Sequence, residues 1–218
     1  MRTTQDIVAA MSANLAPVRR QASPLMRTFM WLALTLVVVG LLAMGHGFRT
    51  NLAARVTELP FQLEVLGAGL TGALAAFAGF ASGIPGRSKW WMVLPFPALG
   101  LWMAVIGQQC LTKWVETGPE GMSLGESGEC LATVGLASLP LSLALAVMLR
   151  HAVVMRPMGS YVMGSLAVAG MAGVAMSLLH ALDGSVMILL FNVVTTLAIV
   201  AIAAALGAFR VSRPAPGV

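Results

Sequence analysis

The sequence predicts an all-α integral membrane protein with six transmembrane helices, both chain ends in the cytoplasm and a short amphipathic helix at the N-terminus. Two observations carry this prediction. First, 58% of the 218 residues are hydrophobic and only 10% are charged, against roughly 25% charged residues in soluble domains. Second, apolar runs of about 20 residues recur along the chain, and a helix of that length crosses a hydrocarbon core about 30 Å thick.

Each transmembrane helix is placed on one apolar run. The six predicted spans are residues 28–48, 63–84, 90–111, 130–149, 158–180 and 186–209. Turn-forming pairs such as Pro85-Gly86 separate them. The first run is too long for the apolar region of a signal peptide, so we expect it to be retained. Pro95 and Pro97 are expected to kink the third helix.

The distribution of Lys and Arg predicts the orientation, because cytoplasmic loops are enriched in both. Successive loops lie on alternate sides of the membrane; ten of these residues fall on the side of the N-terminus and three on the other side. The ten are Arg2, Arg19, Arg20, Arg27, Arg87, Lys89, Arg150, Arg156, Arg210 and Arg213, and the three are Arg49, Arg55 and Lys113. The chain is therefore divided into a cytoplasmic segment (1–27), a membrane domain (28–209) and a cytoplasmic tail (210–218). Since the basic residues are scattered, no direct binding of nucleic acid is predicted.

Strongly polar groups within the predicted spans are few, and most lie near the helix ends; Asn192 is more internal, and we expect it to form a hydrogen bond between helices. Glu64, Gln108, Gln109 and His180 fall at outer ends, where we expect them to reach the interface or cap a helix. The sequence has no H-E-x-x-H, no G-x-S-x-G and no phosphate-binding glycine loop. We therefore predict neither an enzyme nor a bound cofactor, and we interpret the glycines in the spans as helix-packing residues.

The cytoplasmic segment is predicted to contain a short amphipathic helix, capped by Thr3 or Thr4 and ending near Pro17. Its apolar face, within an arc of roughly 100°, comprises Ile7, Val8, Met11 and Leu15. The opposite face carries no positive charge, which favours a protein groove over a membrane surface as the binding partner. Arg19 and Arg20 complete the candidate partner-binding segment, and they are also placed to contact anionic lipid.

Five segments, taken in order, carry a family resemblance. They are DIVAAMSANL, APVRR at 16–20, PLMRTFMWLAL from Pro24, CLATVGLASLPLSLALAVMLR from Cys130 to Arg150, and RPMGSYVMGSLAVAGMAGVAMSLLHALDGS. Together they resemble the bacterial membrane anti-sigma factors of the negative regulator of sigma F type. The resemblance implies a multi-pass inner-membrane protein whose N-terminal segment holds an extracytoplasmic-function sigma factor. An envelope, heavy-metal or oxidative signal from outside would release that sigma factor.

The two cysteines are the candidate sensing residues. The resemblance places Cys130 on one of the family's cysteine positions, whereas Ala181 stands at the second, after His180. Cys110 and Cys130 are both predicted near the outer interface, where a thiol could oxidise or bind a soft metal ion. Both could instead be small packing residues, and whether they bond or bind metal is left open. The alternative function is a small multi-pass transporter or permease component, which would need polar groups at midplane depth.

Overall fold

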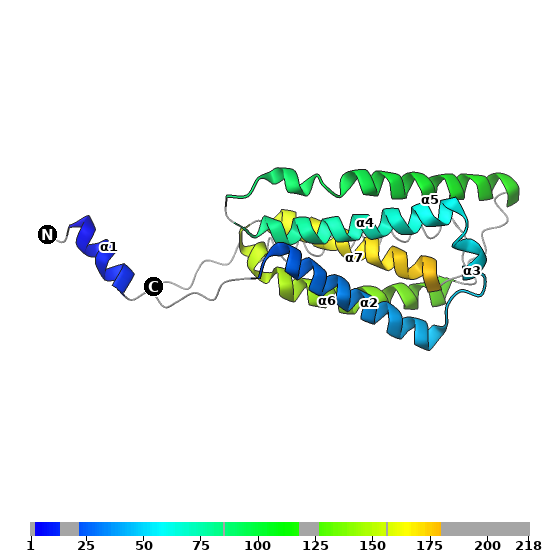
Figure 1. The fold of residues 1–218 in the computed structure, drawn as a ribbon, viewed down its shortest axis with the longest axis horizontal. Coiled ribbons are helices and arrows are strands. Elements are labelled where there is room, and N and C mark those ends of the chain that lie inside the picture. The colour runs from blue at the N-terminus through cyan, green and yellow to red at the C-terminus, as the bar shows by residue number, and fades with distance from the viewer. Residues whose placement is uncertain (1–2, 14–21, 85, 118–126, 156, 180–218) are drawn as a thin grey trace.

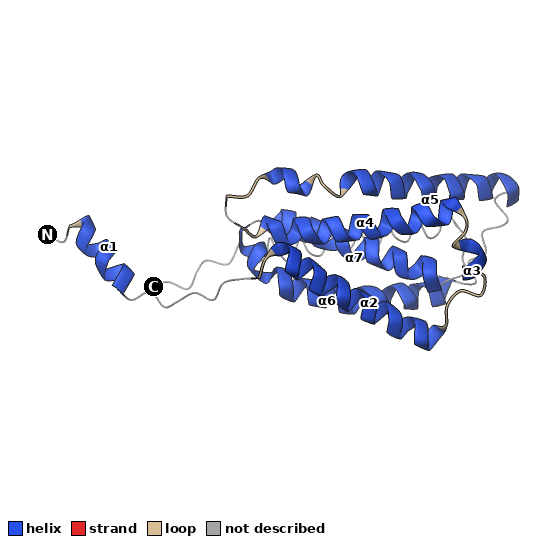
Figure 2. Ribbon diagram, viewed as in Figure 1, coloured by secondary structure: helices blue, strands red, loops and turns tan. Residues whose placement is uncertain are grey.

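A computed structural model describes residues 3–13, 22–84, 86–117, 127–155 and 157–179. Within these ranges the chain is helical and contains no strand (Figure 2). A short N-terminal helix, α1 (Thr4–Ala13), lies apart from an elongated bundle of long helices (Figure 1). The predicted sixth span, 186–209, and the predicted tail, 210–218, lie outside the described residues.

Helix α2 (Pro24–His46) begins one turn before the predicted start at residue 28. Its start is specified locally, because the hydroxyl of Ser23 accepts a hydrogen bond from the backbone N–H of Met26 at 3.3 Å and Pro24 occupies the first turn. It ends at Gly47, whose φ of +82° favours glycine and whose N–H donates to the carbonyl of Ala43.

A short connection joins α2 to α4. It contains the single-turn helix α3 (Leu52–Arg55), and α4 (Leu59–Ser82) follows with Pro60 in its first turn. Arg55 and Glu58 form a salt bridge of 2.6 Å beside the start of α4. The backbone N–H of Arg49 donates to the carbonyl of Leu178 at 3.2 Å, which ties this connection to the end of α7.

The third predicted span does not form one kinked helix, and this expectation was wrong. The chain forms a 3-10 turn, η1 (Lys89–Met92), and then a separate helix, α5 (Phe96–Thr117). Pro95 is buried at the break. Because proline has no N–H and biases the preceding residue away from helix, the two prolines separate the turn from the helix instead of bending it.

Helices α6 (Ser127–Met155) and α7 (Pro157–Leu179) complete the described bundle. Helix α6 extends beyond the predicted span 130–149 at both ends. Its 29 residues correspond to about 43 Å, more than the hydrocarbon thickness. Pro140 lies inside α6 and removes one backbone donor from it.

The centre of the bundle is the contact between α4 and α7. A Cβ atom added at Gly170 would lie 2.7 Å from the carbonyl oxygen of Ala68 and 2.7 Å from the backbone nitrogen of Gly72. The two backbones therefore touch, which is the small-residue packing that membrane helices use. Ser82 and Ser160 add a buried hydrogen bond of 3.0 Å between the same helices, nearer to the start of α7.

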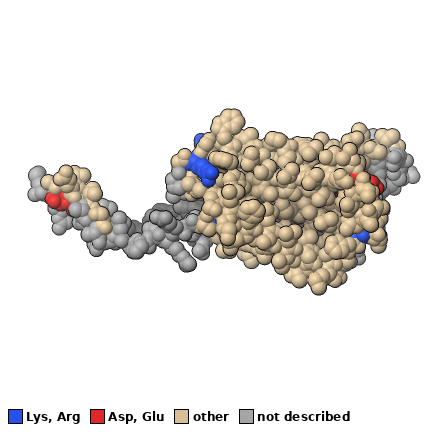
Figure 3. Space-filling view, viewed as in Figure 1, with Lys and Arg blue, Asp and Glu red and all other residues tan. Residues whose placement is uncertain are grey.

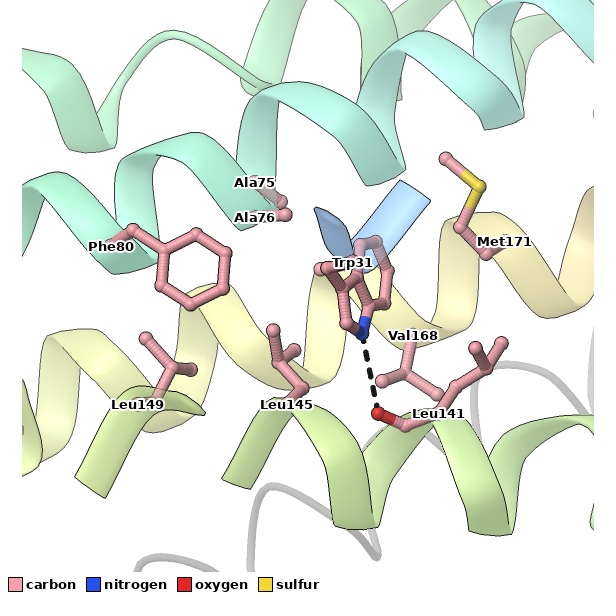
Figure 4. Close-up of a cluster of buried hydrophobic side chains, with 10 residues drawn as sticks. Trp31, Ala75, Ala76, Phe80, Leu141, Leu145, Leu149, Val168 and Met171 are labelled. Carbon is pink, nitrogen blue, oxygen red and sulfur yellow. Dashed lines mark hydrogen bonds between the residues drawn. The ribbon is translucent and has the colours of Figure 1, made fainter. Parts of the chain in front are cut away.

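Helix α2 packs on this pair through Trp31, which is fully buried. The Trp31 ring lies among side chains of α4, α6 and α7, including Ala76, Leu145 and Val168 (Figure 4). Its indole N–H donates to the carbonyl of Leu141 at 3.4 Å. A buried donor in an apolar environment needs such a partner.

Charged side chains in the described part of the chain gather at the two ends of the bundle and leave its visible side uncharged (Figure 3). Among the residues that the structure describes, four segments are long and apolar enough to cross a membrane: Pro24–Gly45, Leu59–Ser82, Lys89–Gln109 and Gly159–Leu179. The apolar part of α6 is shorter, at Gly135–Leu149. The described helices thus indicate association with a membrane.

Candidate functional site

The N-terminal helix α1 has a reciprocal cap at its first turn. The backbone N–H of Asp6 donates to the Thr3 hydroxyl at 3.4 Å, while the N–H and hydroxyl of Thr3 donate to the Asp6 carboxylate at 3.0 and 2.7 Å. This is the arrangement of a capping box with Asp in the third helical position. The Thr3 hydrogen bonds lower the pKa of Asp6 below its ordinary value of 3.8. Of the two predicted caps, Thr3 is the one that the structure uses.

The predicted partner-binding residues fall partly on this helix. Ile7, Val8 and Met11 lie within α1, and the Val8 side chain is 60% exposed. Leu15, Arg19 and Arg20 lie outside the described residues. Every residue of α1 whose burial is described is exposed. The Val8 side chain is therefore accessible on the surface of the capped helix.

The two predicted sensing cysteines lie on neighbouring helices in sequence. Cys110 is on α5, seven residues before its last residue, Thr117, and Cys130 is on α6, three residues after its first residue, Ser127. The end of α5 and the start of α6, which carry these positions, lie at the end of the bundle at which α4 begins (Figure 1). Among the described residues, no three His, Cys, Asp or Glu residues are grouped closely enough to hold a metal ion.

A polar cluster that sequence reasoning missed lies at this same end. The carboxylate of Glu64 on α4 accepts a hydrogen bond from the Gln109 amide of α5 at 3.0 Å and another from the Ser177 hydroxyl of α7 at 2.8 Å. We expected Glu64 and Gln109 to reach the interface or cap a helix, and for both this was wrong. Their side chains join three helices, whereas Gln108 is exposed as expected.

The helical register of α4 contains the signal that could have found this cluster. Residues three, four, seven and eight positions apart share one helical face. Counted from Glu64, those positions are Gly67, Ala68, Thr71 and Gly72, all buried in the structure. A carboxylate on the same face as a row of small residues points between helices and not toward the interface.

Directly beside the polar cluster, Trp102 fixes α5 to the central helix pair. A Cβ at Gly67 of α4 would lie 3.0 Å from the Trp102 Cβ, and one at Gly173 of α7 would lie 2.5 Å from its Cζ2. The indole thus fills a slot that two glycines leave open, and only 3% of Trp102 is exposed. Cys110 lies two helical turns beyond this anchor.

Aromatic rings support cations at the opposite end of the bundle. The Arg27 guanidinium lies 4.7 Å from the centroid of the Phe80 ring, and that of Arg87 lies 4.9 Å from the Trp91 ring. Trp91 also meets Phe77 edge-on, with centroids 5.4 Å apart. Cation–π pairs of this kind hold a charged group beside an apolar surface.

These features define a multi-helix membrane-associated protein with an exposed N-terminal helix at one end and a polar cluster near its cysteines at the other. The profile of a protein family described as negative regulator of sigma F matches residues 11–212, nearly the whole chain. The chain belongs to that family. The match includes Met11, Leu15, Arg19 and Arg20 and begins after Ile7 and Val8. No curated protein and no solved structure matches the chain.

Proposed function

We propose that the protein is a multi-pass anti-sigma factor of the bacterial inner membrane. Its cytoplasmic N-terminal segment sequesters an extracytoplasmic-function sigma factor and releases it on an envelope, heavy-metal or oxidative signal. The observation that carries this proposal is the family match, which extends over the helical domain and into the N-terminal segment. A family described as a negative regulator of a sigma factor requires a surface for that partner, and α1 supplies a candidate.

The exposure of α1 supports a role in binding a partner. Isolated helices of ten residues are marginal in water, so a cap at Thr3 and Asp6 favours the helical form before binding. An amphipathic helix that docks into a groove is a recurring mode of protein recognition. Ile7, Val8 and Met11 would be the anchors, with Leu15, Arg19 and Arg20 extending the segment.

The charge distribution supports an orientation with α1 in the cytoplasm. Arg27 at the start of α2, together with Arg87 and Lys89 before α5, lies at the end of the bundle nearer to α1. Arg49 and the salt-bridged Arg55 lie at the other end. Since positive residues are retained on the cytoplasmic side, the first end would face the cytoplasm.

This orientation would put Cys110 and Cys130 at the outer end, where a metal ion or oxidant arrives. A signal at that end can change the availability of α1 only if the bundle has two arrangements with different affinities for the sigma factor. Helices whose backbones touch at glycines can shift against one another with little repacking of side chains, as at Gly72 and Gly170.

A pull-down of the sigma factor encoded beside this gene tests the proposal. We expect the full-length protein to capture it and an Ile7→Asp, Met11→Asp variant to lose it, because a charge in an apolar groove is left without a partner. The matched control is Gln5→Asp, Ser12→Asp, which adds the same charge to the polar face. Failure of the unsubstituted protein to capture the sigma factor would contradict the proposal.

A small transporter is the second candidate, and one observation favours it: Glu64 is a carboxylate held between helices. Deletion of residues 1–22 separates the two candidates. Loss of sigma-factor inhibition with an intact bundle would support the anti-sigma function. A transport activity that survives the deletion would support the transporter.

A further inference from the structure

The turn between α4 and α5 is fixed to two helices of the bundle and holds one aromatic ring away from both. Within η1, the Trp91 ring meets Phe77 of α4 edge-on, with centroids 5.4 Å apart. The Met92 methyl group occupies space that a Cβ at Gly159 of α7 would need. These two contacts hold the turn in place, and they leave Trp90 between them 78% exposed.

The exposed surface around Trp90 is apolar and continues toward α5. Val93, Leu94 and Phe96 are also exposed. The segment Lys89–Gln109, which begins in this turn, buries the smallest share of its residues among the four candidate spans of the described chain. Most of its apolar side chains are thus available to lipid, and the turn lies at one end of the span. Tryptophan is enriched at that depth of membrane proteins, because its ring is apolar and its indole N–H is polar.

Two cations accompany the aromatic rings of the turn. The Arg87 guanidinium lies 4.9 Å from the centroid of the Trp91 ring, and Lys89, the first residue of η1, is exposed. The sequence between Glu64 and Glu116 contains no acidic residue, so the turn itself carries a net positive charge. Basic side chains are visible at this end of the bundle in Figure 3. The turn therefore combines an exposed indole with a positive surface.

This combination fits the headgroup region of a bilayer that contains anionic phospholipid. An indole favours the boundary between headgroups and acyl chains, and basic residues near the membrane attract anionic headgroups. We propose that residues 86–94 form a binding site for an anionic phospholipid. Trp90 inserts at the level of the headgroups, and Arg87 and Lys89 bind the lipid phosphate.

The apolar surface favours lipid over an acidic protein as the occupant of this site. An acidic protein surface would match the charge of Arg87 and Lys89, but it would not match the exposed apolar side chains that continue from Trp90 toward α5. A phospholipid supplies both a negative headgroup and an apolar tail. The proposal uses the membrane association of the described helices and does not depend on the identity of the cytoplasmic partner.

Quenching of tryptophan fluorescence by brominated lipids tests the site, because bromine quenches a ring only at short range. The full-length protein is reconstituted in phosphatidylcholine bilayers in which part of the lipid is replaced by brominated phosphatidylcholine or by brominated phosphatidylglycerol, the anionic probe. The Trp90 signal is the difference between each protein and its Trp90→Phe counterpart. We expect a preference for phosphatidylglycerol at Trp90 of at least about fivefold, which is the effect of one basic residue near an anionic surface.

Removal of the two cations should abolish this preference. In Arg87→Gln, Lys89→Gln, the two lipids should quench Trp90 about equally. The matched control is Arg55→Gln, Lys113→Gln, which removes two positive charges from the connection before α4 and from the last part of α5, and it should keep the preference. If the first variant does not fold, Lys89→Gln alone changes only an exposed side chain and should lower the preference at least about twofold.

Several results would overturn the proposal. Equal quenching of the unsubstituted protein by the two lipids, or an unchanged preference after removal of the cations, would show that Arg87 and Lys89 do not select the lipid. An equal loss in the control variant would trace the preference to the net charge of the protein. Absence of quenching by either lipid would place Trp90 outside the bilayer, where a protein partner could cover it. Loss of the preference on addition of inorganic phosphate at constant ionic strength would show that the site takes free phosphate and not lipid.

Discussion

The close approach of α4 and α7 makes Gly170→Ala the most informative single substitution. The three heavy atoms nearest to the added methyl would all belong to the backbone: the Ala68 oxygen and Gly72 nitrogen at 2.7 Å and the Gly72 Cα at 2.9 Å. Ordinary contact begins at 3.4 Å, so one helix must move by about 0.7 Å. These backbone atoms cannot make room by a change of rotamer.

The cost can be worked from the contacts along this helix pair. Overpacking of a close-packed site costs about 1–3 kcal/mol. The displacement would also stretch the 3.0 Å Ser82–Ser160 bond and the 2.8 Å Glu64–Ser177 bond, and such bonds in membrane bundles are worth roughly 0.6 kcal/mol each. We therefore expect a loss of about 2–4 kcal/mol in the free energy of unfolding.

The assay is reversible unfolding in mixed micelles by titration with a denaturing detergent, followed by circular dichroism. Gly40→Ala is the matched control, because a Cβ at Gly40 of α2 would meet nothing within 4 Å. The free energy of unfolding of that control should be unchanged or higher by up to about 1 kcal/mol, since Ala favours the helix more than Gly does. Equal stability of the two variants would refute the close contact at Gly170.

Three further predictions follow from other contacts. Trp102→Ala empties the slot between Gly67 and Gly173 and should lower the free energy of unfolding by roughly 3 kcal/mol in the same assay. This is the lower end of the range for buried aromatic residues, because the unfolded helices in a membrane leave the side chain in lipid and not in water. A loss below about 1 kcal/mol would contradict the slot. A double-mutant cycle of Ser82→Ala and Ser160→Ala should return a coupling of about 0.6 kcal/mol, and zero coupling would mean that the hydroxyls do not bond. The pKa of Asp6 is below 3.8 in the helix, so the cap stabilises α1 above that pH and its contribution is lost as pH falls through the lower folded value. The Thr3 amide resonance should therefore titrate below pH 3.8 in the full-length protein and not titrate in Asp6→Asn; a midpoint at or above 3.8 would contradict the cap.

The positions of α2, α4, α6 and α7 were predictable, because length and hydropathy determine which segments form long apolar helices. The boundaries required interactions that those patterns do not contain. Helix α2 starts at Pro24, four residues early, with Ser23 as its cap and the Arg27 guanidinium over the Phe80 ring of a distant segment. The break before α5 was mistaken for a kink, because Pro95 and Pro97 after a 3-10 turn can produce either outcome.

The candidate site was predictable only in part. The capped N-terminal helix follows from local sequence, since Thr3 and Asp6 have the spacing of a capping box. The Glu64 cluster depends on which face of α4 meets α7, and that is a tertiary property. A hydropathy profile shows Glu64 only as a polar residue near a helix end and contains no information on the direction of its side chain.

The glycine contacts between α4, α5 and α7 have a consequence for how this family can vary. In a soluble domain, the largest buried side chains are the ones that vary least between homologues. Here the constraint falls on positions with no side chain at all, Gly67, Gly72, Gly170 and Gly173, where an inserted methyl has no free volume. Large apolar residues on the outside, such as Leu36 and Met44, are exposed and can be exchanged among themselves. Homologues should therefore share these few glycines within an otherwise divergent apolar sequence. The glycines are a better guide for aligning such sequences than the large apolar residues are.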